Sequence, residues 1–176
     1  MIRRSILLMA AMILAGSGSA AGQQGSRPKV GKLGFYVGNW TGRGLMRDNP
    51  AGVFKGIRGR ETCRWAAGGA AVLCEEKETG PGGGWNGVYL LGYDSKQDSY
   101  TLFGIEEPGT VVRGTGKLEN GVWKWTAESV AGGSSSPARY TFTGDGKKSR
   151  MMVVEAPDAS GKWFTVANHR YTRSTQ

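Results

Sequence analysis

The spacing of the turn signals constrains the fold of this chain more than any other feature of its sequence. Between residues 35 and 173, short runs rich in β-branched and aromatic residues alternate with short segments rich in Gly, Asn, Asp, Ser and Pro. No stretch of helical length keeps a 3.6-residue apolar period. Asn120-Gly121 is the strongest hairpin signal, because a type I′ turn needs positive φ at both central residues, and Asp145-Gly146 is a second. The pattern predicts antiparallel strands joined by hairpins.

About ten strands are expected, and every connection between them is of hairpin length. Such a meander hides its edges most simply by closing on itself. We therefore predict an all-β, about ten-stranded antiparallel up-and-down barrel in one domain, residues 35–176. The 30 glycines among 176 residues fit a fold with many turns. The expected strands are Phe35–Arg47, Phe54–Trp65, Ala71–Thr79, Trp85–Asp94, Ser99–Glu106, Thr110–Leu118, Val122–Val130, Ala138–Thr143, Lys147–Ala156 and Lys162–Arg173.

The first 21 residues have the three parts of a secretory signal peptide. A basic start, Met1–Arg4, precedes the apolar run Ile6–Ala15 and the small-residue stretch Gly16–Ala21. The apolar run is shorter than the ~20 residues that a membrane-spanning helix needs, and no later run is long enough. We expect residues 1–21 to be removed and residues 22–34 to form a flexible mature N-terminus. The mature chain is expected in the periplasm or outside the cell, without a transmembrane segment.

The chain is basic, with 23 Lys and Arg against 14 Asp and Glu and a formal net charge of +9. In an exported protein this charge favours anionic envelope components over nucleic acid, although it also serves simply to keep a protein dispersed.

A basic stripe is expected on one face of the second strand, formed by Arg58, Arg60 and Arg64. It has two interpretations, a solvated outer face or a surface that binds phosphate or carboxylate groups. We expect acidic residues of the next strand to pair with it across the hairpin. They are Glu75, Glu76 and Glu78.

The two cysteines, Cys63 and Cys74, both lie in the exported part, where an even count favours a disulfide. The midpoint between them falls between Gly68 and Gly69, where a hairpin would turn. A symmetric hairpin places the two side chains opposite each other, close enough to bond. We predict a structural disulfide between Cys63 and Cys74.

Alternation along the strands places a large aromatic load on the inner face of the barrel. These rings either fill the interior or line a cavity for a flat or apolar ligand. Under the second interpretation the candidate ligand-binding residues are Trp85, Tyr89, Tyr93, Trp123, Trp125 and Tyr140.

The first and last strands carry a family resemblance. Gly38-Asn39-Trp40 resembles the G-x-W motif of the calycin superfamily, the lipocalins and their relatives, and the last strand ends at Tyr171-Thr-Arg173. The resemblance implies that Gly38, Trp40 and Arg173 form a structural signature in which the arginine packs across the indole ring. With Leu91-Gly-Tyr-Asp94 added, the mature chain resembles the secreted bacterial domain of unknown function 1579 family, which implies a fold and no activity.

Little in the sequence points to catalysis, and we do not expect an enzyme. His169 is the single histidine, no G-x-S-x-G elbow is present, and neither phosphate-binding glycine motif occurs. One histidine and two paired cysteines do not make a zinc site, so no metal is expected. The strand count resembles that of nitrobindin-like barrels, and this resemblance implies an alternative in which His169 ligates heme iron.

These observations favour an exported, monomeric barrel that carries or senses a small apolar or amphipathic molecule, without a cofactor. Two alternatives stay open. One is a heme-binding, nitrobindin-like protein that uses His169, and the other is a structural or envelope-interaction protein whose barrel is filled.

Overall fold

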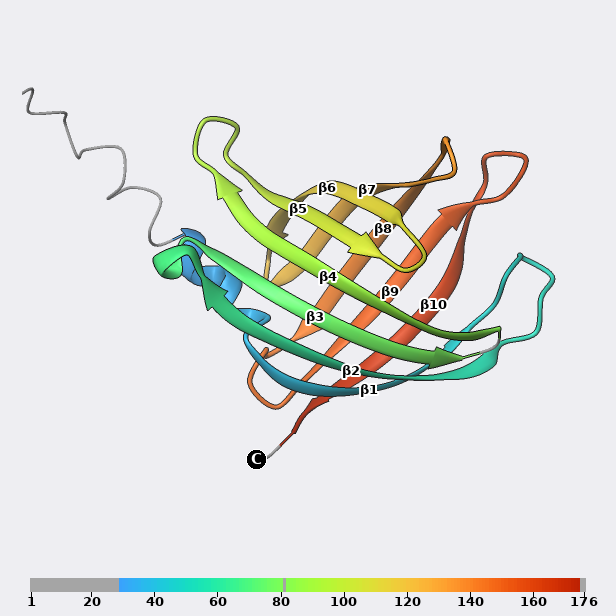
Figure 1. Ribbon diagram of the computed structural model, residues 1–176, viewed down its shortest axis with the longest axis horizontal. Helices are drawn as coiled ribbons and strands as arrows, with labels where there is room; N and C mark the ends of the chain where they lie inside the picture. Colours follow the sequence, from blue (N-terminus) through green and yellow to red (C-terminus); the bar gives the residue numbers. More distant parts are fainter. Residues whose placement is uncertain (1–28, 81, 175–176) are drawn as a thin grey trace, which may run out of the picture.

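The computed structural model describes residues 29–80 and 82–174 of the chain, so the predicted signal peptide lies outside the described residues. The described part is a closed barrel of ten strands (Figure 1). The strands are β1 (Gly38–Met46), β2 (Lys55–Ala66), β3 (Ala71–Gly80), β4 (Gly83–Asp94), β5 (Ser99–Glu106), β6 (Thr110–Glu119), β7 (Val122–Ala131), β8 (Ser134–Gly144), β9 (Ser149–Pro157) and β10 (Trp163–Arg173).

Each strand pairs antiparallel with its neighbours in the chain, and β1 pairs with β10 to close the barrel. The predicted fold is therefore confirmed. Closure starts at Trp40, whose register partner is Arg173, and continues to Met46 opposite Ala167. Because the sheet returns to its first strand, it has no free edge that could pair with another chain. Within the described residues, no helix has the length and apolar character needed to cross a bilayer.

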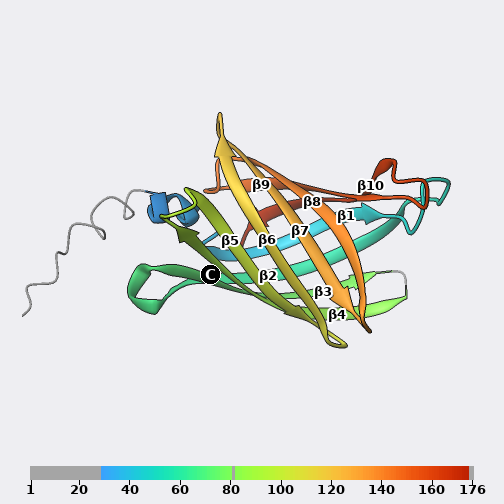
Figure 2. The same ribbon diagram turned by 90° about the horizontal axis from the view of Figure 1, so that it is seen from above.

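The start of the barrel differs from the sequence prediction, which began the first strand at Phe35. Residues Gly31–Phe35 instead form a short 3-10 helix, η1, and β1 begins at Gly38. Figures 1 and 2 show η1 at one end of the barrel, the end that also carries the turn between β2 and β3. Leu33 of η1 is fully buried. The flexible segment expected at residues 22–34 thus has a described part, from residue 29, that covers this end.

The β7–β8 hairpin is longer than predicted, because β8 begins at Ser134 and not at Ala138. Ser134 pairs with Ala131, and Ser135 pairs with Val130. A backbone ladder needs no apolar side chains, so a serine run at the rim of a barrel extends a strand that composition alone assigns to a loop.

The disulfide between Cys63 and Cys74 is present, as predicted. The two residues are direct register partners on β2 and β3, with their Cα atoms 4.0 Å apart. The turn between them is made by a second short 3-10 helix, η2 (Ala67–Gly69), in which Gly68 and Gly69 have positive φ. The bond fixes the β2–β3 register at the η1 end.

Aromatic side chains fill the η1 end of the barrel. Trp123 and Trp125 are both buried on the inner face of β7, with nearly parallel rings. Tyr36 packs edge-on against Trp123, and its hydroxyl accepts a hydrogen bond of 2.8 Å from Trp125 Nε1. Tyr100 packs against Trp123 with ring centroids 4.6 Å apart. This cluster closes one end of the interior.

Arg173 lies over the indole ring of Trp40, with its guanidinium carbon 4.6 Å from the ring centroid, as the calycin resemblance implies. Backbone carbonyls fix this guanidinium, which donates hydrogen bonds of 2.6 Å to Lys147 O and 2.8 Å to Val37 O. Gly38 has a φ of 139°, and a Cβ atom there would collide with the fixed guanidinium. Only glycine suits this position.

Gly38→Ala is expected to lower the free energy of unfolding by about 2 kcal/mol, because it adds both backbone strain and a clash. Chemical denaturation measures the change. Gly56→Ala on β2, where a Cβ would meet nothing within 4 Å, is the matched control and changes stability by less than about 0.5 kcal/mol. In an Arg173→Ala background the penalty at Gly38 shrinks. An equal penalty in both backgrounds would show that Arg173 does not contribute.

Removal of the disulfide by Cys63→Ala with Cys74→Ala is expected to lower the free energy of unfolding by about 2–3 kcal/mol. The cysteines are 11 residues apart, and a bridge over a loop of this length restricts the unfolded chain by about that amount. Urea denaturation with and without reductant measures it. Reductant should bring the wild-type protein to the variant's midpoint and leave the variant unchanged; a wild-type midpoint insensitive to reductant would contradict the role.

Candidate functional site

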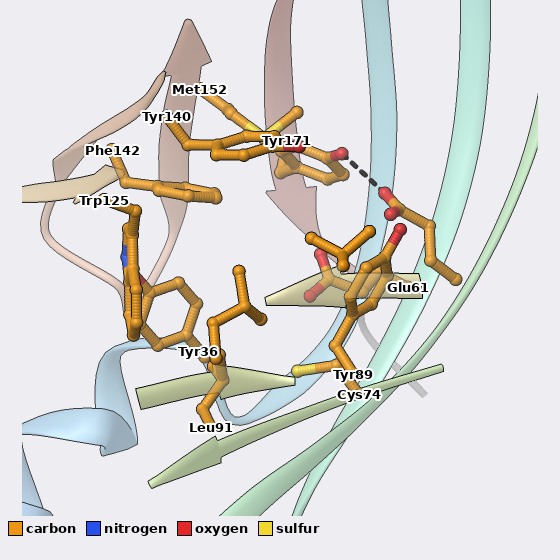
Figure 3. Close-up of a pocket in the computed structure, with 13 residues that line it drawn as sticks. Tyr36, Glu61, Cys74, Tyr89, Leu91, Trp125, Tyr140, Phe142, Met152 and Tyr171 are labelled. Carbon is orange, nitrogen blue, oxygen red and sulfur yellow. Dashed lines mark hydrogen bonds between the residues drawn. The ribbon is translucent and has the colours of Figure 1, made fainter. Parts of the chain in front are cut away.

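A cavity lies inside the barrel, next to the aromatic cluster at the η1 end. Its empty volume is about 620 Å³, including the open space at its mouth. The rings of Trp125, Phe142 and Tyr140 lie on one side, and Glu61 and Tyr89 lie on the other (Figure 3). The full lining is Tyr36, Glu61, Cys74, Glu76, Tyr89, Leu91, Leu102, Val112, Trp125, Tyr140, Phe142, Met152 and Tyr171.

Three of the six aromatic residues predicted to bind a ligand line this cavity. They are Tyr89, Trp125 and Tyr140. The other three lie elsewhere. Trp123 is buried in the cluster at the η1 end, and Tyr93 packs against Tyr100 near the turn between β4 and β5. Trp85 is half-buried on β4, opposite Glu78 in the ladder.

Charged residues inside the barrel were not predicted. Glu61 on β2, Glu78 on β3 and Arg150 on β9 are buried. Sequence alternation contains the signal for two of them, because Glu61 precedes Cys63 by two positions and Glu78 follows Cys74 by four. Residues an even number of positions from an inward cysteine share its face of the strand.

The expectation that all three glutamates of β3 pair with the basic stripe is wrong for two of them. Glu75 does so, with an oxygen 2.6 Å from Arg64 Nη1 on the exposed outer face. Glu76 and Glu78 point to the other face and make their hydrogen bonds inside the barrel. Arg58 and Arg60 of the stripe are exposed, as a solvated outer face requires.

Arg150 supplies a buried positive charge. Its side chain has no exposed surface, and its guanidinium forms an ion pair with Glu61, a residue of β2. Four aromatic rings surround the guanidinium carbon at centroid distances of 4.5 to 5.7 Å. They belong to Tyr36, Trp40, Phe142 and Tyr171. Carboxylate and ring faces together replace the water that a guanidinium loses on burial.

Glu76 presents a second carboxyl group to the cavity. The Tyr171 hydroxyl lies 2.8 Å from Glu76 Oε1, the bond that is dashed in Figure 3, and 3.2 Å from Glu78 Oε1. Burial raises the pKa of Glu76 well above its usual range, and the neighbouring charges of Glu61 and Glu78 raise the pKa further. Deprotonated Glu76 is therefore an unfavourable charge in the protein without a ligand.

His169 is buried beside this group, and its ring stacks on Tyr171 with centroids 5.5 Å apart. Its Nδ1 lies 3.1 Å from Glu78 Oε1 but without hydrogen-bond geometry, so it is a buried nitrogen without a partner. The side chain is not part of the cavity lining. Heme ligation by His169 stays a prediction.

Glu61, Cys63 and Cys74 place three potential metal-ligating atoms within 4.8 Å of one another. Both sulfur atoms belong to the disulfide. They are therefore not thiolates, and this group lacks the charged sulfur ligands that a zinc site of this kind requires.

The sequence of residues 32–173 matches the model of a protein family described as protein of unknown function DUF1579. The chain belongs to the DUF1579 family. The resemblance seen in the sequence is thereby confirmed. No curated protein matches this DUF1579 chain.

Solved structures share the fold of this DUF1579 barrel. The S-type phycobiliprotein lyase CPES from Guillardia theta is 13% identical with a TM-score of 0.60, over 84% of this chain and 93% of that one. Rv2717c from M. tuberculosis is 12% identical with a TM-score of 0.62, over 84% of this chain and 98% of that one. At these identities the likeness establishes the barrel fold and nothing finer.

Glu76→Gln is expected to stabilise the protein at pH 8 by on the order of 1 kcal/mol and to have no effect near pH 4. The pKa of Glu76 is higher in the folded than in the unfolded chain. Between those two pKa values the folded state holds more protons, so the free energy of unfolding falls as pH rises; glutamine removes that loss. The charged and titratable groups around Glu76 are Glu61, Glu78, Tyr89, Arg150, His169 and Tyr171.

Thermal denaturation at both pH values measures this difference. Glu75→Gln is the matched control, because Glu75 precedes Glu76 on β3 and is exposed. Its replacement should change stability little at either pH. A Glu76→Gln variant less stable than wild type at pH 8 would show that the carboxylate supports the fold.

Proposed function

We propose that this protein binds one small apolar or amphipathic molecule in the barrel cavity and acts as a carrier or sensor of it, as a monomer. The observation that carries the proposal is the cavity itself, in which the rings of Trp125, Tyr140 and Phe142 face a few polar groups. A barrel evolved only for stability would gain from filling this space, since interiors are normally packed to the density of organic crystals. Apolar walls with sparse polar groups are typical of ligand sites.

The polar groups that line the cavity support binding over catalysis. Glu61 is held in its ion pair with Arg150, and the Tyr89 hydroxyl donates a hydrogen bond of 2.7 Å to Glu106. The lining residues include no histidine, serine, threonine or lysine, and its cysteine is in the disulfide. These groups orient a ligand and do not form a nucleophile with an adjacent base.

Export is the second part of the proposal. The signal-peptide pattern of residues 1–21 supports it, and so does the disulfide, because such bonds persist in oxidising compartments. The proposed location is the periplasm or the outside of the cell. The net charge of +9 leaves contact with anionic envelope components as an accessory role of the outer face.

Filling the cavity should weaken ligand binding while leaving the fold intact. Leu91 lines the cavity, whereas its neighbour Leu90 is 43% exposed on the outer face of β4. We expect Leu91→Trp to weaken binding of the neutral dye N-phenyl-1-naphthylamine, followed by fluorescence titration, at least tenfold. Leu90→Trp is the matched control and should bind like wild type. Leu102→Phe, at the register partner of Leu91, repeats the test if Leu91→Trp melts early.

Native mass spectrometry of the mature protein from its producing cells complements the titration. A bound small molecule would identify the natural ligand, and heme would be recognised by its mass and its Soret absorbance. A wild-type protein that carries no adduct and binds no dye would overturn the carrier proposal in favour of a barrel with a structural role.

A further inference from the structure

The ionisable side chains that line the cavity include two carboxyl groups and no basic group. Glu61 and Glu76 line the cavity, while Arg150 does not. The side chain of Arg150 is completely buried and is already paired with Glu61. Among residues 29–80 and 82–174, no Lys or Arg forms an ion pair with Glu76 or Glu78. The cavity therefore carries an unbalanced negative charge whenever Glu76 is ionised.

We propose that the cavity is selective for a molecule that joins an apolar body to a protonated amine. The ammonium group binds the carboxylate of Glu76, and the apolar body lies against Trp125 and Phe142. This inference rests on the proposed function, because it names the ligand class of the same cavity.

Geometry favours an ammonium group at this position. Glu76 Oε1 already accepts one hydrogen bond, from Tyr171, and a carboxylate has room for several more. An amine supplies both the missing donors and the missing positive charge, and it gains a charge-assisted bond in a desolvated place. The aromatic faces that line the cavity add cation–π attraction.

His169, which stacks on Tyr171, gives a second and independent sign of an incomplete polar network. His169 is only 2% exposed, and its Nδ1 has no hydrogen-bond partner although it faces the Glu78 carboxylate. Buried polar atoms are normally satisfied, so each exception calls for an explanation, such as a further partner that completes the network. Tyr171 contacts both glutamates, so a ligand on Glu76 changes the partners available to Glu78 and His169.

An anionic ligand fits this cavity poorly. A carboxylate or phosphate placed near Glu61 and Glu76 would meet like charge in a region with little water. The excess positive charge of the protein does not offset this, because the basic stripe is on the outer face and is screened by salt over about 8 Å at physiological ionic strength. The outside of the barrel and its cavity therefore favour ligands of opposite sign.

A ligand series with one skeleton and three head groups tests the inference. The compounds are 4-phenylbutylamine, 4-phenylbutanol and 4-phenylbutyrate, titrated calorimetrically into the full-length mature protein at pH 7.5. We expect the amine to bind at least tenfold more tightly than the alcohol, and the butyrate to bind most weakly. Glu76→Gln should remove the advantage of the amine and leave the affinity for the alcohol within about twofold.

Glu75→Gln is the matched control, since it removes the same charge from the next position of β3 on the outer face and should leave all three affinities unchanged. If the alcohol binds and the amine binds no more tightly, the inference is wrong while the proposed function stands. If none of the three compounds and no neutral dye binds, the proposed function fails with it. Equal losses in the two glutamine variants would assign the preference to overall charge and overturn the role of Glu76. The wild-type series decides the question even if Glu76→Gln does not fold.

Discussion

The ion pair between Arg150 and Glu61 organises the interior of this barrel. It joins β9 to β2 across the inside of the barrel, through two residues that are 89 positions apart in the chain. A guanidinium without exposed surface is tolerated because a carboxylate and four aromatic rings surround it. Removing one partner of such a pair typically destabilises a protein by about 3–5 kcal/mol, because the other charge is left buried and alone. The pair thus holds two distant strands at a fixed distance.

The same guanidinium separates two regions with different roles. Trp40 lies beneath both Arg150 and Arg173, at 4.5 and 4.6 Å, and links the buried pair to the strand junction that closes the barrel. On the other side, Glu61, Tyr36 and Tyr171 each contact Arg150 and also line the cavity. Closure of the fold and the shape of the cavity therefore depend on one buried cation. A change at the cavity wall acts on the stability of the junction.

Sequence reasoning predicted the strands, their closure and the disulfide because each depends on local information. Period-two alternation, turn residues and the symmetric position of Gly68 and Gly69 are all visible within a few residues. It missed η1, because five residues of 3-10 helix carry no apolar period. It also missed Arg150, which is one basic residue at the start of an apolar strand; its partner is far along the chain, so no local pattern marks it as buried.

The cavity residues also divide into those that the sequence predicted and those that it missed. Alternation identified Tyr89, Trp125 and Tyr140, since aromatic residues on an inner face have few other places to lie. The sequence predicts that Glu76 pairs with the basic stripe, because acidic residues beside such a stripe usually do. Glu76 follows Cys74 by two positions and therefore shares its face of β3. The disulfide across the hairpin fixes that face as the inward one. In a barrel, one secure inward residue orders every neighbour on its strand.

The opposite charges on the two faces of β2 have a consequence for assembly. Arg60 points to solvent and Glu61 points inward, while Lys77 is exposed between the inward Glu76 and Glu78. A slip of one residue in β2 would exchange its two faces, drive Arg58, Arg60 and Arg64 into the interior and carry Cys63 away from Cys74. Misregistered chains are therefore penalised by desolvation before any sulfur chemistry occurs, and oxidation then makes the correct alignment permanent. In this barrel the charge pattern selects the register of the hairpin, and the disulfide then fixes it.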